Sequence, residues 1–136
     1  MRLVVDASIA LAWCFDDEKG SYAEAVLESL AENRVLVASH WFLEVANALL
    51  MAERRGRTAP ADTVRAIALL GGLPVDCDDQ IAEKGMKETL ALAKTYGLTT
   101  YDAAYLELSL REALPLASLD DDLVAAAKKA GAKLAD

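Results

Sequence analysis

The sequence predicts an α/β protein: a single three-layer α/β/α domain with a mostly parallel central sheet. The first supporting observation is that short aliphatic runs alternate with longer amphipathic stretches along the chain, as in proteins built from strand–helix–strand units. The second is length, because 136 residues suffice for one buried core but not for two domains of ordinary size. We therefore expect residues 1–136 to form one domain with one active centre.

The first quarter of the chain predicts two strands and two helices. Residues 3–5 form a short aliphatic run, typical of a strand that is buried on both faces. A helix can begin near Ser8, and Gly20 interrupts the pattern. Apolar residues then recur at helical spacing over 22–30, and a second aliphatic run covers 35–38.

The middle of the chain predicts two further helices and a strand. Ser39 is expected to cap a long helix that runs to about Arg55 and stops before a glycine. A proline in the first turn opens the next helix, over 58–70, and two glycines close it. Residues 74–77 are the third short strand.

The last third continues the alternation. Residues 79–96 and 100–111 have helical spacing, and a glycine ends the first of them. A fourth strand is expected at 114–117, a helix at 120–130 and a weak last strand at 132–134. Strand ends and helix starts in such a sheet line the crevice where ligands bind, so residues there are the first candidates for a site.

Composition sets limits on the class of protein. The chain is 54% hydrophobic and 26% charged, which is typical of a globular protein, and no apolar run is long enough for a membrane span. We expect no membrane association and a cytoplasmic location. Cys14 and Cys77 form neither a disulfide framework nor a zinc-like pattern, so both are expected to be small core residues. The net charge of −8 argues against nucleic-acid binding by a broad basic surface.

Three aspartates stand at positions that suit a site but also have ordinary structural explanations. Asp6 directly follows the first strand, where it can cap the next helix. Asp102 lies three residues after Thr99, at the spacing of a capping box. Asp120 begins an acidic run in the first turn of a helix, where negative charge is favourable to the helix dipole.

Glu44 is harder to explain structurally. Its helix is apolar in nearly every direction, which predicts a buried helix. A lone buried carboxylate costs several kcal/mol unless it is paired, protonated or bound to a cation. Asn47, three residues later, lies on the same side of the helix and can orient Glu44.

Together the four acids predict a metal site. Carboxylates gathered at one edge of a sheet repel one another, and a divalent cation removes that cost while keeping them ionised. Mg²⁺ or Mn²⁺ suits such an all-oxygen site. With one or two ions it can cleave a phosphodiester by activating water and neutralising the scissile phosphate.

Other catalytic signatures are missing from the sequence. His40 is the only histidine, and we expect it to have a structural role at a helix start. No Gly-x-Ser-x-Gly motif occurs. Neither a phosphate-binding glycine loop nor a Gly-x-Gly-x-x-Gly motif is found. The one basic cluster includes Arg54 and Arg55, which are ordinarily a solvated helix end but are also candidate contacts for RNA phosphates.

At these residues the sequence resembles the PIN-domain family, and within it the VapC-like toxins of toxin–antitoxin pairs. The run from Val4 to Ser8 is similar to the family's first motif, and the run from Glu44 to Leu49 looks like the second. Residues 98–106, which read Leu-Thr-Thr-Tyr-Asp-Ala-Ala-Tyr-Leu, form the most specific match, and 116–120 look like the last motif. Ser118 stands where that motif often has threonine, which keeps the hydroxyl.

The resemblance implies a PIN-like nuclease domain, with Mg²⁺ or Mn²⁺ held by the four acids. It also implies supporting roles for Ser8 and Asn47, and it favours Asp120 over the two acids that follow it. A PIN-domain toxin of this kind is a metal-dependent endoribonuclease, commonly a homodimer, inhibited by a small antitoxin protein. These properties come from the resemblance and not from composition or spacing.

Three other classes fit part of the pattern. Haloacid-dehalogenase-like phosphatases also have an acid after the first strand, but Ser8 stands in place of their second aspartate and no suitably placed lysine is evident. A catalytically silent module would use the same acids only for metal or partner binding. A phospho-receiver domain needs an acceptor aspartate after a middle strand, whereas residues 51–57 are predicted to be helical.

Overall fold

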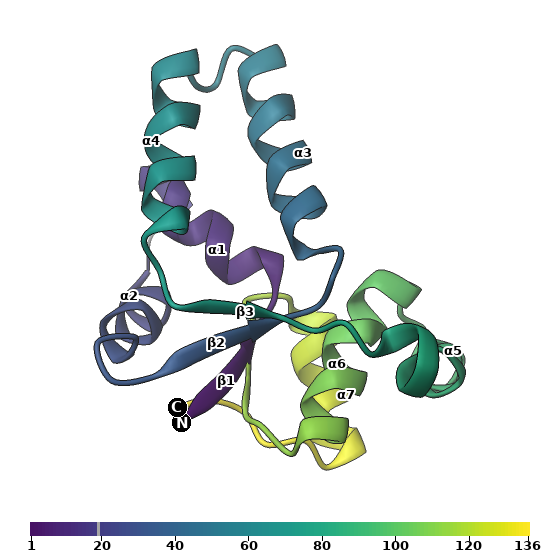
Figure 1. Ribbon diagram of the computed structural model, residues 1–136. Helices are drawn as coiled ribbons and strands as arrows, with labels where there is room; N and C mark the ends of the chain where they lie inside the picture. Colours follow the sequence, from purple (N-terminus) through teal and green to yellow (C-terminus); the bar gives the residue numbers. More distant parts are fainter. Residues whose placement is uncertain (19) are drawn as a thin grey trace.

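The central sheet has four parallel strands. The structure, a computed structural model, describes residues 1–18 and 20–136. The strands are β1 (Arg2–Val5), β2 (Arg34–Val37), β3 (Val75–Cys77) and β4 (Leu116–Ala117). Their order is β3-β2-β1-β4, and every neighbouring pair is parallel (Figure 1). The expected parallel sheet is therefore confirmed.

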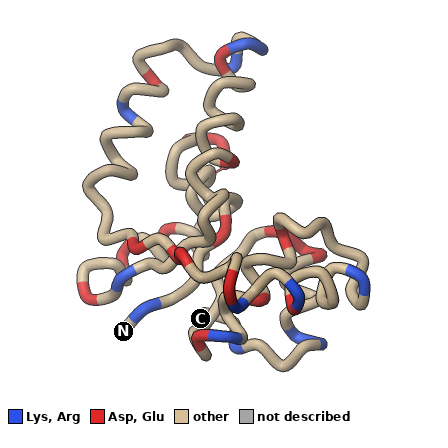
Figure 2. The backbone as a smooth tube through the Cα atoms, turned by 45° about the vertical axis from the view of Figure 1, so that its right-hand side comes forward, with Lys and Arg blue, Asp and Glu red and all other residues tan. Residues whose placement is uncertain are grey.

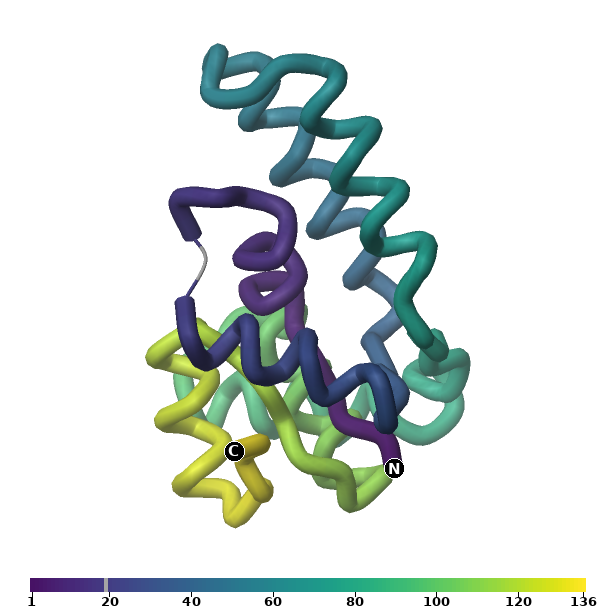
Figure 3. The backbone as a smooth tube through the Cα atoms, turned by 90° about the vertical axis from the view of Figure 1, so that its left-hand side faces the viewer, coloured from purple at the N-terminus to yellow at the C-terminus, as the bar shows by residue number. Residues whose placement is uncertain are grey.

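Helices connect the strands. The described residues form α1 (Ala7–Cys14), α2 (Ser21–Ser29), α3 (Trp41–Arg54), α4 (Pro60–Gly71), α5 (Met86–Tyr96), α6 (Thr100–Glu112) and α7 (Asp121–Ala130). The helices α3 and α4 form a hairpin that projects from one side of the sheet, whereas α6 and α7 lie on the other side (Figures 1 and 3). None of the helices in the described ranges is long and apolar enough to cross a bilayer.

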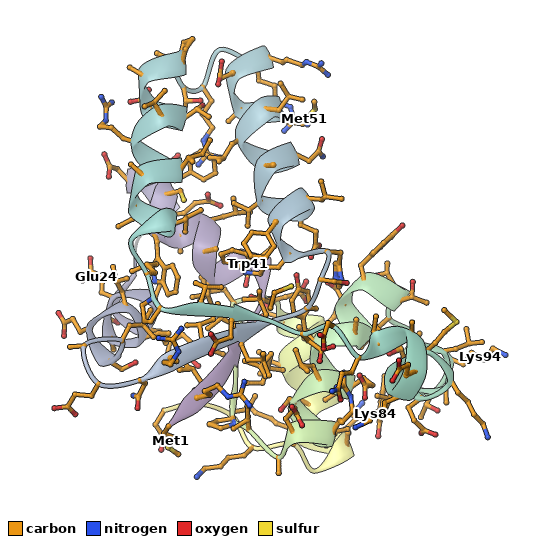
Figure 4. The ribbon with its side chains drawn as sticks, in the orientation of Figure 1. Met1, Glu24, Trp41, Met51, Lys84 and Lys94 are labelled. Atoms are coloured by element: carbon orange, nitrogen blue, oxygen red, sulfur yellow. The ribbon has the colours of Figure 1, made fainter. Side chains whose placement is uncertain are left out.

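The core forms around β1 and β2. Val4, Val5, Val35 and Val37 are fully buried, as expected for parallel strands with helices on both faces. Trp41 lies at the base of the hairpin, where α3 leaves the sheet (Figure 4). Its indole N–H donates to the backbone carbonyl of Asp6 at 3.2 Å, so the start of α3 is fixed against the end of β1.

Several expected details are wrong. The long helix after β2 is not capped by Ser39, because the chain turns at 39–40 and His40 is the N-cap, with no capping hydrogen bond from its side chain. The weak last strand is reduced to a single bridge between Leu116 and Leu134. Cys77 is exposed and not in the core, because it ends β3, the edge strand, and Cys14 is only partly buried.

The helix expected over 79–96 is divided into a π-helical turn, η2 (Ile81–Gly85), and α5. A buried ion network packs against the π turn. Arg111 donates two hydrogen bonds to Asp78 (3.0 and 2.9 Å) and two to Glu107 (2.8 and 2.9 Å). Glu107, which is 3% exposed, lies directly against the backbone of Gly85. The network thus joins the end of β3 and the π turn to α6.

We predict that Gly85→Ala destabilises the protein. A Cβ at Gly85 would lie 2.5 Å from Oε1 and 3.0 Å from Cδ of Glu107. The Glu107 side chain cannot easily move aside, because it is buried and paired with Arg111. The expected loss in the free energy of unfolding is about 1–3 kcal/mol by chemical denaturation.

Gly71→Ala is the matched control, because nothing lies within 4 Å of the Cβ it would add to α4. Alanine there should leave stability unchanged or raise it by up to about 1 kcal/mol. Equal stabilities for the two variants would contradict the prediction that Glu107 leaves no room for a Cβ at position 85.

Candidate active site

The site begins at the carboxyl edge of the sheet, where β1 and β4 end side by side. Val5 pairs with Ala117, and the amide of Asp6 donates to the carbonyl of Ala117 at 3.3 Å. Asp6 therefore lies next to the loop that carries Ser118 and Asp120. Glu44 and Asp102 reach the same region from the first turns of α3 and α6. The four predicted acids thus come from four different segments of the chain.

Asp6 is held by three hydrogen bonds. The hydroxyls of Ser8 and Ser118 donate to its two carboxylate oxygens, each at 2.6 Å, and the amide of Ile9 donates at 3.3 Å. The last contact makes Asp6 the N-cap of α1, so the structural explanation and the site explanation both apply. The two serines also accept from the amides of Leu119 (2.8 Å) and Asp120 (3.0 Å), which ties the two loops together.

Burial controls the ionisation of Asp6. The residue is only 3% exposed, and desolvation raises the pKa of its carboxyl to about 6. The hydrogen bonds from Ser118, Ser8 and Ile9 oppose this shift without cancelling it, and the charge of Asp120 adds to it. An ionised Asp6 is therefore costly near neutral pH unless a positive charge is near.

Asp102 and Asp120 combine capping positions with places near the cluster. Asp120 is the N-cap of α7 and accepts from the amide of Leu123 at 3.1 Å. The amide of Asp102 donates to the Thr99 hydroxyl at 3.1 Å, which caps α6. Desolvation raises the pKa of the Asp102 carboxyl, and the charges of Asp120 and then Glu44 raise it further. The acids are therefore close enough to destabilise one another's charged forms.

The environment of Glu44 differs from the expected one. Its side chain is 32% exposed, because α3 stands in the projecting hairpin with Phe42 and Leu43 facing solvent. The expectation of a buried helix that is apolar all round is therefore wrong. Asn47 is exposed and makes no hydrogen bond to Glu44 in the described part of the chain.

Two residues outside the predicted site hold Glu44 instead. The Tyr105 hydroxyl donates to Oε1 of Glu44, and Nε2 of His40 lies 3.2 Å from the same oxygen. Nε2 is also 2.9 Å from the carbonyl of Tyr101, so a proton on this nitrogen serves both acceptors. Tyr105 is three residues after Asp102, and this spacing on one helix face was the available signal for it.

The predicted basic contacts lie elsewhere. Arg54 is the last residue of α3 and Arg55 follows it, at the tip of the hairpin (Figure 2). Glu44 is ten residues earlier, so these arginines are roughly 15 Å from it along the helix. The structure does not bring them to the acids.

The donor chemistry of the cluster fits a hard divalent cation. All four side chains offer carboxylate oxygens, which are the ligands that such cations prefer. A cation would also offset the repulsion from Asp120 and Glu44 that adds to the raised pKa of Asp102. Over residues 1–18 and 20–136, however, no three acids, histidines or cysteines are already grouped to hold an ion. Binding would therefore require these side chains to turn toward one another.

The sequence is similar to known proteins over most of its length. The PIN domain family matches residues 3–129. The curated relative Ribonuclease VapC3 of Pyrobaculum aerophilum is 31% identical over 123 residues, which cover 90% of this chain and 92% of that protein.

Solved structures share the fold at lower identity. PAE2754 from P. aerophilum superposes with a TM-score of 0.72 at 23% identity and covers 94% of this chain and 86% of that one. VapBC2 from Rickettsia felis, bound to a DNA fragment from its promoter, gives 0.70 at 11% identity, covering 99% and 98%. The sarcin–ricin-loop-cleaving toxin VapC20 of Mycobacterium tuberculosis gives 0.61 at 18%, covering 91% and 94%.

We predict that Asp6→Asn stabilises the metal-free protein at neutral pH. A carboxyl whose pKa rises from 3.8 to about 6 on folding lowers stability progressively as the pH rises from 4 to 6, and fully above that. In EDTA, the variant should gain up to about 3 kcal/mol over the wild type at pH 7.5, and almost nothing at pH 4. Denaturant unfolding at the two pH values measures this difference.

Glu32→Gln is a suitable control, because it removes an exposed acid in a turn outside the cluster. It should change stability by less than about 0.5 kcal/mol at either pH. An Asp6→Asn variant that is clearly less stable than the wild type at pH 7.5 would contradict the assigned cost of burying this carboxylate.

Proposed function

Because the chain belongs to the PIN domain family, we propose that it is a VapC-like endoribonuclease, the toxin of a toxin–antitoxin pair, that hydrolyses RNA with Mg²⁺ or Mn²⁺. The observation that carries the proposal is the cluster of Asp6, Glu44, Asp102 and Asp120 at the carboxyl edge of the sheet, where burial and neighbouring acids raise the pKa values of Asp6 and Asp102. A bound cation would stabilise the charged forms of these acids.

The four acids have two different parts in the proposed reaction. Asp6, Asp102 and Asp120 would hold the ion, and the serines on either side of Asp6 fix its carboxylate plane. A bound Mg²⁺ or Mn²⁺ supplies charge neutralisation at the scissile phosphate and makes attack by water easier at neutral pH. Net charge also favours this arrangement, because a chain of −8 repels RNA unless cations reverse the field at the site.

Glu44, which the sequence also makes a candidate metal ligand, would accept a proton from the attacking water. Tyr105 and His40 both contact Oε1, so Oε2 carries no hydrogen bond from the described residues. Burial and the neighbouring acids raise the pKa of the Tyr105 hydroxyl, so it remains a proton donor to Glu44 at every physiological pH. These contacts orient one oxygen and leave the other available to solvent and substrate.

The geometry is unfavourable to a phosphatase that forms a phosphoaspartate. Such a phosphatase needs a second aspartate two residues after its nucleophile, whereas Ser8 occupies that position and donates to Asp6. The catalytically silent module keeps the same cluster and differs only in outcome, so a cleavage assay separates it from the nuclease.

We predict metal-dependent cleavage of RNA by the antitoxin-free protein. With Mg²⁺ or Mn²⁺ the wild type should cut a pool of single-stranded and structured RNAs, and EDTA should abolish cutting. Asp6→Asn and Asp102→Asn should each lower the rate at least 100-fold, because each removes a charged ligand. End-labelled RNA resolved on sequencing gels measures the rates.

Glu32→Gln, outside the cluster, should cut at the wild-type rate. A further readout separates the nuclease from the silent module: Mn²⁺ should raise the melting temperature of the wild type but not of Asp6→Asn. Metal stabilisation without any cleavage would favour the silent module. The absence of both metal stabilisation and cleavage would overturn the proposed site.

The hairpin offers a surface for the antitoxin. An apolar groove of about 290 Å³ runs between α3 and α4, and its lining includes Phe42 and Ile67, which are 49% and 60% exposed. Exposed apolar side chains around a groove are typical of protein-binding sites. We assign the groove to an apolar segment of the cognate antitoxin; the R. felis neighbour, a VapBC pair, supports such a partner but carries no information about the groove.

We predict that Ile67→Glu weakens antitoxin binding at least 10-fold, since it loses apolar contact and places a charge in the groove. Val64→Glu is the matched control, because Val64 is exposed on α4 but does not line the groove. Calorimetric titration measures affinity. A homodimer is the other expected assembly, and light scattering measures it. If Ile67→Glu binds antitoxin normally but is a monomer where the wild type is a dimer, the groove belongs to the dimer interface.

A further inference from the structure

A second pocket opens beside the acid cluster. It has a volume of about 340 Å³ and lies between the π turn, α5 and the first turns of α6. Its lining is almost entirely apolar and includes Ile81, Met86, Leu90 and Ala104. The volume is at the lower end of the range for small-molecule sites, about 300–1,000 Å³. The pocket is therefore large enough for one small organic group.

The pocket lies beside the proposed active site, although none of the four acids lines it. Tyr101 and His40 both line it. Tyr101 directly precedes Asp102, and His40 lies 3.2 Å from Glu44. A group bound in the pocket would therefore lie near the proposed active site.

The mouth of the pocket presents an aromatic surface. Tyr101 is 62% exposed, although its phenol ring is large and apolar. Its ring centroid is 5.6 Å from that of His40, with the planes tilted by 54°. The imidazole is fixed in turn by the carbonyl of Tyr101 and by Glu44. Exposed rings held in this way are the usual stacking surfaces for unpaired bases.

Thr89 adds a polar group that lacks a partner. It is 5% exposed and lines the pocket, and its Oγ1 is the buried side-chain atom in the described residues that has no hydrogen bond. A buried hydroxyl without a partner is unfavourable by about 1–3 kcal/mol and requires an explanation. Rotation about χ1 would offer this hydroxyl, as donor or acceptor, to the edge of a ligand in the pocket.

From these observations we propose that the pocket receives one unpaired nucleobase of the RNA substrate, next to the scissile phosphate. The inference rests on the proposed ribonuclease function and extends it to base selection. No lysine or arginine lines the pocket among the described residues, so it does not suit a phosphate group. A flat ring that stacks on Tyr101 and forms a hydrogen bond with Thr89 is the chemistry that the lining favours.

The test is sequencing of the cleavage ends from a randomised single-stranded RNA pool, for the wild type and for Tyr101→Ala and Tyr101→Phe. We expect a base preference at one position beside the cut in the wild type, retained in Tyr101→Phe and lost in Tyr101→Ala. On the preferred sequence, Tyr101→Ala should lower kcat/KM about 10- to 100-fold, the value of one base stacked on an aromatic ring.

Thr89→Val provides an independent variant of nearly equal shape. It should alter the base preference at the same position while the melting temperature stays equal or rises, because the unpartnered hydroxyl is gone. A merely structural role for Thr89 would not change base preference. An abasic nucleotide at the selected position should lower the wild-type rate as much as Tyr101→Ala does, and the two changes together should not add.

The outcomes are distinct. An unchanged base profile in Tyr101→Ala, or an equal loss of rate on all sequences, would overturn the base site and leave the ribonuclease standing. Weaker antitoxin binding by Tyr101→Ala with unchanged cleavage would assign the pocket to the protein partner and also overturn it. No cleavage by the wild type with either metal would overturn the proposed function and, with it, the base site.

Discussion

The burial of one carboxylate at the end of β1 is the constraint on which the site depends. Asp6 is nearly inaccessible, and two serine hydroxyls, one backbone amide and the start of α1 are arranged around it. The indole of Trp41 donates to its backbone carbonyl, which fixes α3 and with it Glu44. The loops after β1 and β4 are joined through the same serines. A carboxylate whose charged form is unfavourable is thus also the one that organises its neighbours.

Local patterns were sufficient for the fold and for the segments that carry the acids. The strands, most helices and the positions of Asp6 and Asp120 at strand ends follow from short aliphatic runs and capping residues, which act over a few positions in the sequence. The surroundings of Glu44 could not be predicted in this way, because Tyr105 and Tyr101 are about sixty residues away along the chain. The solvent exposure of α3 depends on the projecting hairpin, and the π turn at 81–85 packs against a network centred on Arg111, whose partners are distant in the sequence. Both are tertiary effects.

The charge distribution explains how an acidic chain can act on a polyanion. The net charge of −8 gives no broad basic surface, and the arginines at the hairpin tip are remote from the acids. Attraction for RNA must then be local, and cations held by the acid cluster can supply it. Stacking on exposed rings adds binding energy that needs no positive charge. The proposed site uses both, so it can bind RNA without the broad basic surface that the chain lacks.

Helix α6 connects the chemistry to the proposed choice of base. Within two turns it carries Tyr101 at the pocket, Asp102 in the acid cluster and Tyr105 against Glu44. Arg111, near its other end, binds Asp78 and Glu107, and Glu107 packs against the π turn whose Ile81 lines the same pocket. A shift of α6 would therefore move the stacking surface, one proposed metal ligand and the support of Glu44 together. The buried ion network thus links the helix that carries Asp102 to the π turn that lines the pocket.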